Sequence, residues 1–253
     1  MPSTSKWHPL KLEAGWFTGN GTSAETDNKL DFIGRLGYSN ESGNKNFEYG
    51  AGLSYYNGSI YDTNRLVYEM GDFSGIKAYK KASVQRDDSS CHKREYIGFD
   101  GQFSFKTLLG KTALRADYTF GTQPGSSRKN TSPSDTTSIT GPVYMRRFTG
   151  GIIYLVHTFP NSIHSIVIKY DFYDPNSDLK GDQVGQAATG SKATNNTDIS
   201  YKTWGFGYVA EMNRNLRFMV YYDLVKNETS KNLKNYNADL KDNVLTFRVQ
   251  YKF

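Results

Sequence analysis

The last twelve residues of the chain, 242–253, read DNVLTFRVQYKF and alternate between apolar and polar side chains without a break. One face carries Leu245, Phe247, Val249, Tyr251 and Phe253. A period of two residues predicts a β-strand whose two faces meet different environments. An aromatic residue at the end of such a strand is typical of the closing strand of a transmembrane β-barrel, whose aromatic side chains lie at the membrane interfaces. We therefore expect Phe253 and Tyr251 to form the ending that the outer-membrane assembly machinery reads.

Composition is compatible with this prediction. The mean hydropathy is −0.65, and no run approaches the roughly 18 to 20 apolar residues that a membrane helix needs. This excludes helical membrane proteins but not barrels, whose strands are only half apolar. Aromatic residues make up 15% of the chain and 24 residues are glycine, a mixture that suits strands and tight turns.

Charge and cysteine content argue against two other classes of protein. The net charge is +6, but Lys and Arg are interleaved with Asp and Glu, so no basic stripe for nucleic acid emerges. The single cysteine, Cys91, lies beside His92 in a polar stretch, and a metal site would need several converging ligands. We expect no nucleic-acid partner, no metal and no cofactor.

The alternating pattern recurs along the chain and predicts about ten strands. They cover residues 9–17, 30–38, 47–55, 97–105, 111–120, 147–156, 165–172, 204–210, 216–224 and 242–253. In the strand over 147–156 we place Phe148, Ile152 and Tyr154 on the apolar face with Arg147 opposite, although Ile153 and Leu155 then interrupt the polar face.

The connections alternate in length with strand parity. After the first strand and its polar connection, the long connections cover about 57–93, 122–142, 176–200 and 227–241, and short turns separate them. Outer-membrane barrels have short periplasmic turns and long outer loops. The pattern predicts one domain over 1–253, an all-β, antiparallel, up-and-down transmembrane β-barrel in the bacterial outer membrane.

The carboxyl-terminal third resembles a known family. The segments IVIKYDFYDPNSD, YKTWGFGY, LRFMVYYDLVKNET and DNVLTFRVQYKF are similar to the end of porins of the phosphate-selective porin O and P family, in the form common in Bacteroidetes. The resemblance implies a sixteen-stranded, trimeric outer-membrane channel of a Gram-negative bacterium. Because about ten strands and no export signal are present, we expect a carboxyl-terminal portion that lacks its native first strands. A complete ten-stranded barrel is the alternative, since closure demands only an even number of strands.

In a porin the working residues are the charges that face the lumen. Strand parity predicts these cationic pore-lining residues: Arg35, Lys111, Arg115, Arg147, Lys169, Arg217 and Arg248. Carboxylates share their faces, as Asp117 does beside Arg115 and Asp171 beside Lys169, so they could neutralise one another in the wall. We therefore do not carry phosphate selectivity over to this chain. Glycines on the same face, at positions 15, 50, 52, 205 and 207, favour an open interior.

The predicted function is a porin that allows passive diffusion of small hydrophilic solutes or ions, with a weak preference for anions. The expected partners are outer-membrane lipid, the permeating solutes, the assembly machinery and further copies in a homotrimer. The alternative is a non-conducting structural or surface-recognition barrel.

An enzyme is not expected, because only His92 lies in an outer loop, beside Ser89 and Ser90. Asp174, Asn176 and Asp178 have the spacing of a calcium loop, but its glycine is missing, and a turn is favoured.

Overall fold

The structure is a computed structural model that describes residues 9–19, 29–42, 46–61, 66–82, 91–130 and 141–253. Its strands are β1 (Leu10–Thr18), β2 (Leu30–Glu41), β3 (Phe47–Tyr61), β4 (Val67–Phe73), β5 (Ile76–Lys81), β6 (Cys91–Thr107), β7 (Gly110–Gly125), β8 (Val143–Thr158), β9 (His164–Asp174), β10 (Tyr201–Glu211), β11 (Leu216–Asn227) and β12 (Val244–Tyr251). Two short 3-10 helices, η2 (Gly181–Gln183) and η3 (Asn196–Asp198), lie between β9 and β10. The predicted all-β class is confirmed.

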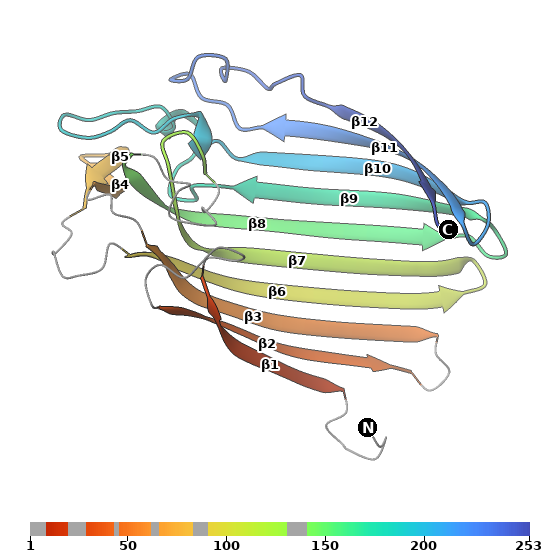
Figure 1. Cartoon of the computed structure of the whole chain (residues 1–253). Coiled ribbons are helices and arrows are strands. Elements are labelled where there is room, and N and C mark those ends of the chain that lie inside the picture. The colour runs from red at the N-terminus through yellow and green to blue at the C-terminus, as the bar shows by residue number, and fades with distance from the viewer. Residues whose placement is uncertain (1–8, 20–28, 43–45, 62–65, 83–90, 131–140) are drawn as a thin grey trace.

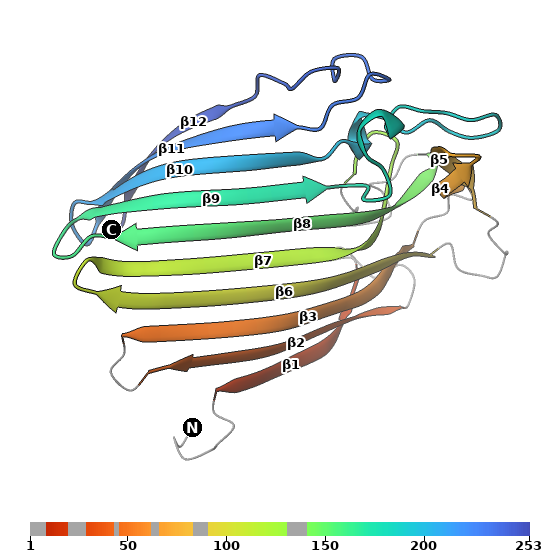
Figure 2. The same cartoon turned by 180° about the vertical axis from the view of Figure 1, so that it is seen from behind.

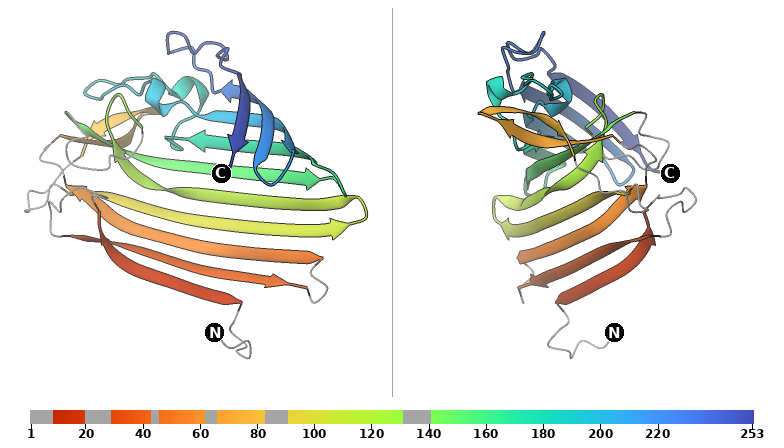
Figure 3. Two further views of the ribbon diagram at one scale, coloured as in Figure 1. Left: turned by 45° about the vertical axis from the view of Figure 1, so that its right-hand side comes forward. Right: turned by 90° about the vertical axis from the view of Figure 1, so that its left-hand side faces the viewer.

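Ten strands form one antiparallel layer in the order β1-β2-β3-β6-β7-β8-β9-β10-β11-β12. Short connections lie at one end of this layer and long ones at the other (Figures 1 and 2). The layer is curved, with β1 and β12 as its two edges (Figure 3). Within the described residues no pairing joins these two edges.

The strands are staggered along the layer. A row of directly paired residues can be followed across the sheet from strand to strand. It starts at Leu12, near the short-turn end of β1, and ends at Lys226, at the long-loop end of β11. The row passes through Leu36, Leu53, Phe99, Tyr118, Gly151, Phe172 and Lys202. A closed barrel requires this kind of stagger, because its strands tilt against its axis.

The first long connection is more ordered than predicted. We expected a long outer loop over about 57–93, but β3 continues to Tyr61 and β4 and β5 form a hairpin. Val67 and Tyr68 of β4 pair in parallel with Val143 and Tyr144 of β8. The hairpin therefore docks on the long-loop end of the wall (Figure 1).

The two faces of the layer differ as the alternation predicts. One face, here called the outward face, carries aliphatic and aromatic side chains that remain exposed. Leu12 is 74% exposed, Trp16 is 68% exposed and Phe247 is 71% exposed. The inward face carries most of the charged and polar side chains of the wall. A continuous exposed apolar surface of this extent is typical of a membrane-facing wall.

The predicted facing of β8 is wrong. Tyr118 of β7 pairs with Gly151, and Leu114 pairs with Leu155, so Ile153 and Leu155 share the outward face with those residues. The two apolar residues that seemed to interrupt a polar face in fact lie on the outward face. Phe148, Ile152 and Tyr154 point inward. Arg147 is therefore an outward residue, and its neighbour Arg146 lies on the inward face.

The deepest burial lies at the long-loop end, in the connections there and in the strand ends that they cover, such as Ile60 of β3 and Val143 of β8. Tyr79, Leu179, Val184, Asn176 and Asp198 are each at most 1% exposed, and all of them belong to the hairpin or to the connection between β9 and β10. A single layer has no second sheet to pack against, so away from this end most of the wall's large apolar side chains stay exposed. The long connections form a core at their own end of the sheet.

Asp and Asn side chains stabilise two turns, the first of which was predicted. After β9, the carboxylate oxygen Oδ1 of Asp174 accepts a hydrogen bond of 3.0 Å from the backbone N–H of Asn176. Between β10 and β11, Oδ1 of Asn213 accepts from the backbone N–H groups of Asn215 and Leu216, each at 2.9 Å. Asp and Asn nucleate turns by such bonds to the backbone two residues on.

The facing of β8 can be tested with a matched pair of substitutions. We expect Ile153→Arg to destabilise the protein by about 2 to 4 kcal/mol, because it places a charge against the hydrocarbon. Ile152→Arg should cost much less, because the guanidinium enters the polar side next to Asp117, with which Ile152 pairs. Urea unfolding of the protein folded in phospholipid vesicles measures both. A larger loss for Ile152→Arg would contradict the facing.

Candidate pore wall and outer cap

Six of the seven predicted pore-lining cations lie on the inward face. They are Arg35, Lys111, Arg115, Lys169, Arg217 and Arg248. The seventh, Arg147, is outward and forms an ion pair with Asp178. Arg147 lies above the apolar part of its strand, where an outward charge can remain in the aqueous and headgroup region.

Arg35 of β2 reaches across a whole strand to its partner. Its guanidinium forms a two-bonded ion pair with the Asp100 carboxylate on β6, with Nη2 donating to Oδ1 at 2.8 Å. β3 lies between them, and its residue beneath the pair is Gly52. A Cβ atom at Gly52 would lie 2.4 Å from Nη2 of Arg35 and from Oδ2 of Asp100. The glycine lets the pair lie flat on the wall.

The same arrangement occurs at the outer end of β3. Nη2 of Arg94 on β6 donates to Oδ2 of Asp31 on β2 at 2.9 Å, and both side chains are buried. A Cβ at Gly58 would lie 2.2 Å from the Asp31 carboxyl group. The hydroxyl of Tyr56 donates to the same Asp31 carboxylate.

A third pair crosses β10. Nζ of Lys169 on β9 lies 2.7 Å from the Asp171 carboxylate and 2.9 Å from the Asp223 carboxylate on β11. The crossing lies over Gly205, where a Cβ would meet the Tyr221 hydroxyl at 2.3 Å and Oδ1 of Asp223 at 2.8 Å. The predicted neutralisation of Lys169 by Asp171 is present.

These contacts correct the interpretation of the inward glycines. The ring of Tyr221 covers Gly207 as well as Gly205, and the Arg35 pair covers Gly52. The glycines do not mark empty interior. They let long side chains from neighbouring strands lie along the wall instead of across the lumen. The spacing of glycines on the polar face was the sequence signal for these pairs.

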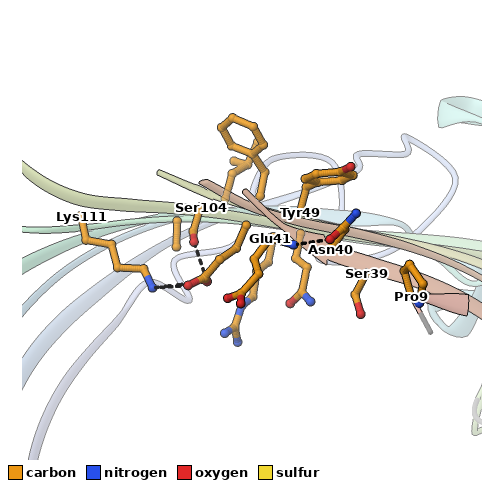
Figure 4. Close-up of a pocket in the computed structure, with 13 residues that line it drawn as sticks. Pro9, Ser39, Asn40, Glu41, Tyr49, Ser104 and Lys111 are labelled. Atoms are coloured by element: carbon orange, nitrogen blue, oxygen red, sulfur yellow. Dashed lines mark hydrogen bonds and ion pairs between the residues drawn. The ribbon is translucent and has the colours of Figure 1, made fainter. Parts of the chain in front are cut away.

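A fourth pair borders a cavity at the short-turn end of the inward face. Nζ of Lys111 on β7 lies 3.4 Å from the Glu48 carboxylate on β3, and the Ser104 hydroxyl donates to Glu48 at 2.9 Å. In Figure 4 Ser104, Lys111 and Ser39 lie on one side of the strands and Tyr49 on the other. The cavity has a volume of about 610 Å³ and is open to solvent, and Arg115 also lines it.

The remaining predicted cations differ in their partners. Arg217 forms an ion pair with Glu211 across the β10–β11 turn. Arg115 and Arg248 make no ion pair or hydrogen bond with any described residue, and Arg115 is not paired with Asp117. They are the cations of this set that the described wall leaves available to a solute.

The long connections form a compact unit, the outer cap, made of β4–β5, residues 175–200 and residues 227–243. Its centre is an ion pair that is fully buried: Nε of Arg146 donates to Oδ1 of Asp198 at 2.9 Å. The same oxygen accepts from the Tyr79 hydroxyl at 2.6 Å and from Nδ2 of Asn176 at 2.9 Å. Burial and the nearby Asp198 carboxylate raise the pKa of Tyr79 well above its ordinary value, so Tyr79 stays a donor.

An apolar cluster completes the outer cap. Leu179, Val184 and Ile199 pack with Met70 of β4 and with Leu233 and Tyr236 of the last connection. Glu228 joins the two carboxyl-terminal connections, since its carboxylate accepts from the backbone N–H of Gly181 at 2.6 Å and from the Ser200 hydroxyl at 2.9 Å. Because Arg146 belongs to the inward face of the wall, the cap is attached to that face at the long-loop end.

The described residues that could have formed a metal site or a catalytic site do not come together. No group of His, Cys, Asp or Glu in the described residues could hold a metal ion. Asn176 is fully buried in the cap and bonded to Asp198, so the Asp174–Asp178 segment serves as a turn. His92 is a buried residue of β6, while its predicted neighbours Ser89 and Ser90 lie outside the described residues.

Comparisons with known proteins add little to this description. No protein-family model matches the chain, and no curated protein matches it. A solved structure described as the NanC porin in a rhombohedral crystal form superposes with a TM-score of 0.36 and 10% sequence identity, over 96% of this chain and 99% of that chain. A likeness at this level carries no argument, so the fold rests on the strands themselves. The described residues contain no helix long and apolar enough to span a membrane.

The role of the inward glycines predicts a contrast between two substitutions. Gly52→Ala should destabilise the protein by about 1 to 3 kcal/mol, as overpacking does, because its Cβ separates Arg35 from Asp100. Gly101→Ala on the outward face should be neutral or stabilising, because its nearest contact is 4.0 Å away. Equal losses in urea unfolding would show that Gly52 has no special role.

Adjacent arginines of β8 provide a test of the outer cap. Arg146→Ala leaves Asp198 buried without its cation, which should cost about 3 to 5 kcal/mol. Arg147→Ala removes an exposed pair and should cost about 1 kcal/mol or less. Hydrogen exchange measures the result: Arg146→Ala should speed exchange in β4–β5 and residues 175–200 while β9 to β11 stay protected. Unchanged exchange in the cap would exclude Arg146 as its anchor.

Proposed function

We propose that this chain forms the wall of an outer-membrane porin through which small hydrophilic solutes and ions diffuse passively. The observation that carries the proposal is that one layer of strands has two continuous faces of opposite character. The outward face is apolar and exposed, and the inward face is charged but flat, because its ion pairs lie over glycines. This combination fits lipid on one side and a water-filled passage on the other.

Closure of the wall is part of the proposal. β1 runs towards the long-loop end and β12 away from it, so the edges are antiparallel and either pair directly or receive an even number of further strands. An open edge in lipid would leave backbone groups unsatisfied at several kcal/mol each. We favour further strands from a longer chain, with three copies forming a trimer. Disulfide crosslinking of Ala14→Cys to Val249→Cys in a Cys91→Ser background distinguishes the two, since efficient crosslinking requires direct pairing.

The unpaired cations give the passage a slight preference for anions. Most inward charges of the wall neutralise one another, whereas among the described residues Arg115 and Arg248 have no anionic partner and Asp117 has no cationic one. Local charge near a narrow passage concentrates ions of opposite sign. Phosphate selectivity would need several converging donors, and the described wall does not bring its free arginines together.

Bilayer recording of the purified protein tests the function. We expect single-channel conductance and a small anion-selective reversal potential in a salt gradient. Arg115→Glu should shift the reversal potential towards cation selectivity. Lys202→Glu makes the same charge change on the outward face and should leave the reversal potential nearly unchanged. Cation selectivity of the unmodified protein would contradict the preference for anions.

One observation favours a second candidate function. The outer cap has its own buried centre, which a surface-recognition barrel would also need in order to present fixed loops. A correctly folded protein that inserts into bilayers without conducting would favour this recognition function over the porin.

A further inference from the structure

Five aromatic rings form a row across the inward face, directly below the outer cap. We call Tyr56, Tyr96, Phe148, Tyr173 and Tyr201 the inner aromatic row. They come from β3, β6, β8, β9 and β10 in that order. Successive ring centroids are 5.0, 5.3, 6.2 and 5.9 Å apart, so each ring contacts the next. All five residues lie on the inward face. They therefore do not belong to the aromatic belts that would contact lipid on the outward face.

The wall makes space for this row at β7. Gly121 pairs with both Tyr96 and Phe148, so the strand between these two residues contributes no side chain. The two rings therefore meet edge to face over Gly121, at an interplanar angle of 79°. A side chain at Gly121 would have no room, because its Cβ would overlap the backbone of Glu95 and Tyr96 on β6.

Access to the row increases from its centre to one end. Phe148 is only 8% exposed, beneath the Arg146 anchor of the cap two residues away, whereas Tyr201 is 39% exposed. Tyr56, Tyr96 and Tyr173 are half-buried. A solute that enters below the cap thus meets the Tyr201 end of the row.

Polar groups lie next to this accessible end. Tyr201 pairs with Tyr173, and two residues further into the wall Thr203 pairs with Asp171. Asp171 and Asp223 both form an ion pair with Lys169. The side chains of these three residues are 15 to 22% exposed. The cluster holds two carboxylates and one ammonium group, so it disfavours anions while offering both acceptors and donors.

We propose that the inner aromatic row, with the Lys169 cluster, is a binding site for neutral saccharides that pass through the pore. The inference rests on the proposed porin function and names a solute class for it. A sugar ring has an apolar face of C–H groups that stacks on aromatic rings, and hydroxyl groups at its edge that bond to carboxylates and ammonium groups. Small ions would not use the rings, and lipid would not reach the polar face.

Bilayer recording with maltohexaose as the probe tests this site. We expect reversible, concentration-dependent block of the current. Tyr201→Leu removes the ring but keeps apolar bulk, and should weaken the block about two- to tenfold. Tyr201→Phe should retain it. Tyr222→Leu, on the outward face of β11, is the control and should behave as the unmodified protein. Polyethylene glycol of similar size has no sugar ring and should block equally in all variants.

The outcomes separate the two proposals. An unmodified protein that does not conduct overturns the porin function itself. Conductance without block by maltohexaose, or block that Tyr201→Leu leaves unchanged, overturns the saccharide site and leaves the porin in place. If Tyr201→Leu fails to fold, Tyr173→Leu provides the same comparison one strand away in the row.

Discussion

The wall depends on the alternation of side chains across a single layer of paired strands. With no second sheet to cover either face, every second residue must suit lipid and the residues between must suit water. This constraint explains why exposed side chains such as Leu12, Trp16 and Phe247 are compatible with a stable fold. It also explains why the charged residues of the other face need partners that hold them along the wall. The pairs Arg35–Asp100, Arg94–Asp31 and Lys169–Asp223 meet this need by crossing one strand over a glycine.

The outer cap is stabilised by a buried centre, which the single layer of the wall does not have. Its central residues are buried, and at its centre lies the Arg146–Asp198 pair with donors from Tyr79 and Asn176. Removing one partner of such a pair is costly because it leaves an uncompensated charge. The cap therefore joins three connections that are far apart in sequence to the long-loop end of β8.

The sequence predicted the wall well and the cap poorly. A period of two residues is a local signal, so all ten wall strands and the turns at Asp174 and Asn213 could be recognised from their own residues. The cap depends on contacts between segments such as Tyr79 and Asp198, which no local period records. The facing of β8 was missed because Phe148 and Tyr154 suggested the lipid side, and only pairing with β7 showed that Ile153 and Leu155 occupy it. The same error placed Arg147 on the inward face instead of Arg146.

The most direct test of the account asks which face of the sheet meets water. Val167 and Ile168 are neighbours on β9 and both are apolar, so their composition does not decide their facing. Single cysteines at these positions, in a Cys91→Ser background, can be treated in outer-membrane vesicles with a thiol reagent that is charged and membrane-impermeant. The account predicts rapid labelling of Val167→Cys, which pairs with inward Gly207, and slow labelling of Ile168→Cys, which pairs with outward Phe206. Faster labelling of Ile168→Cys, or equal labelling of both, would contradict a water-filled passage along the inward face.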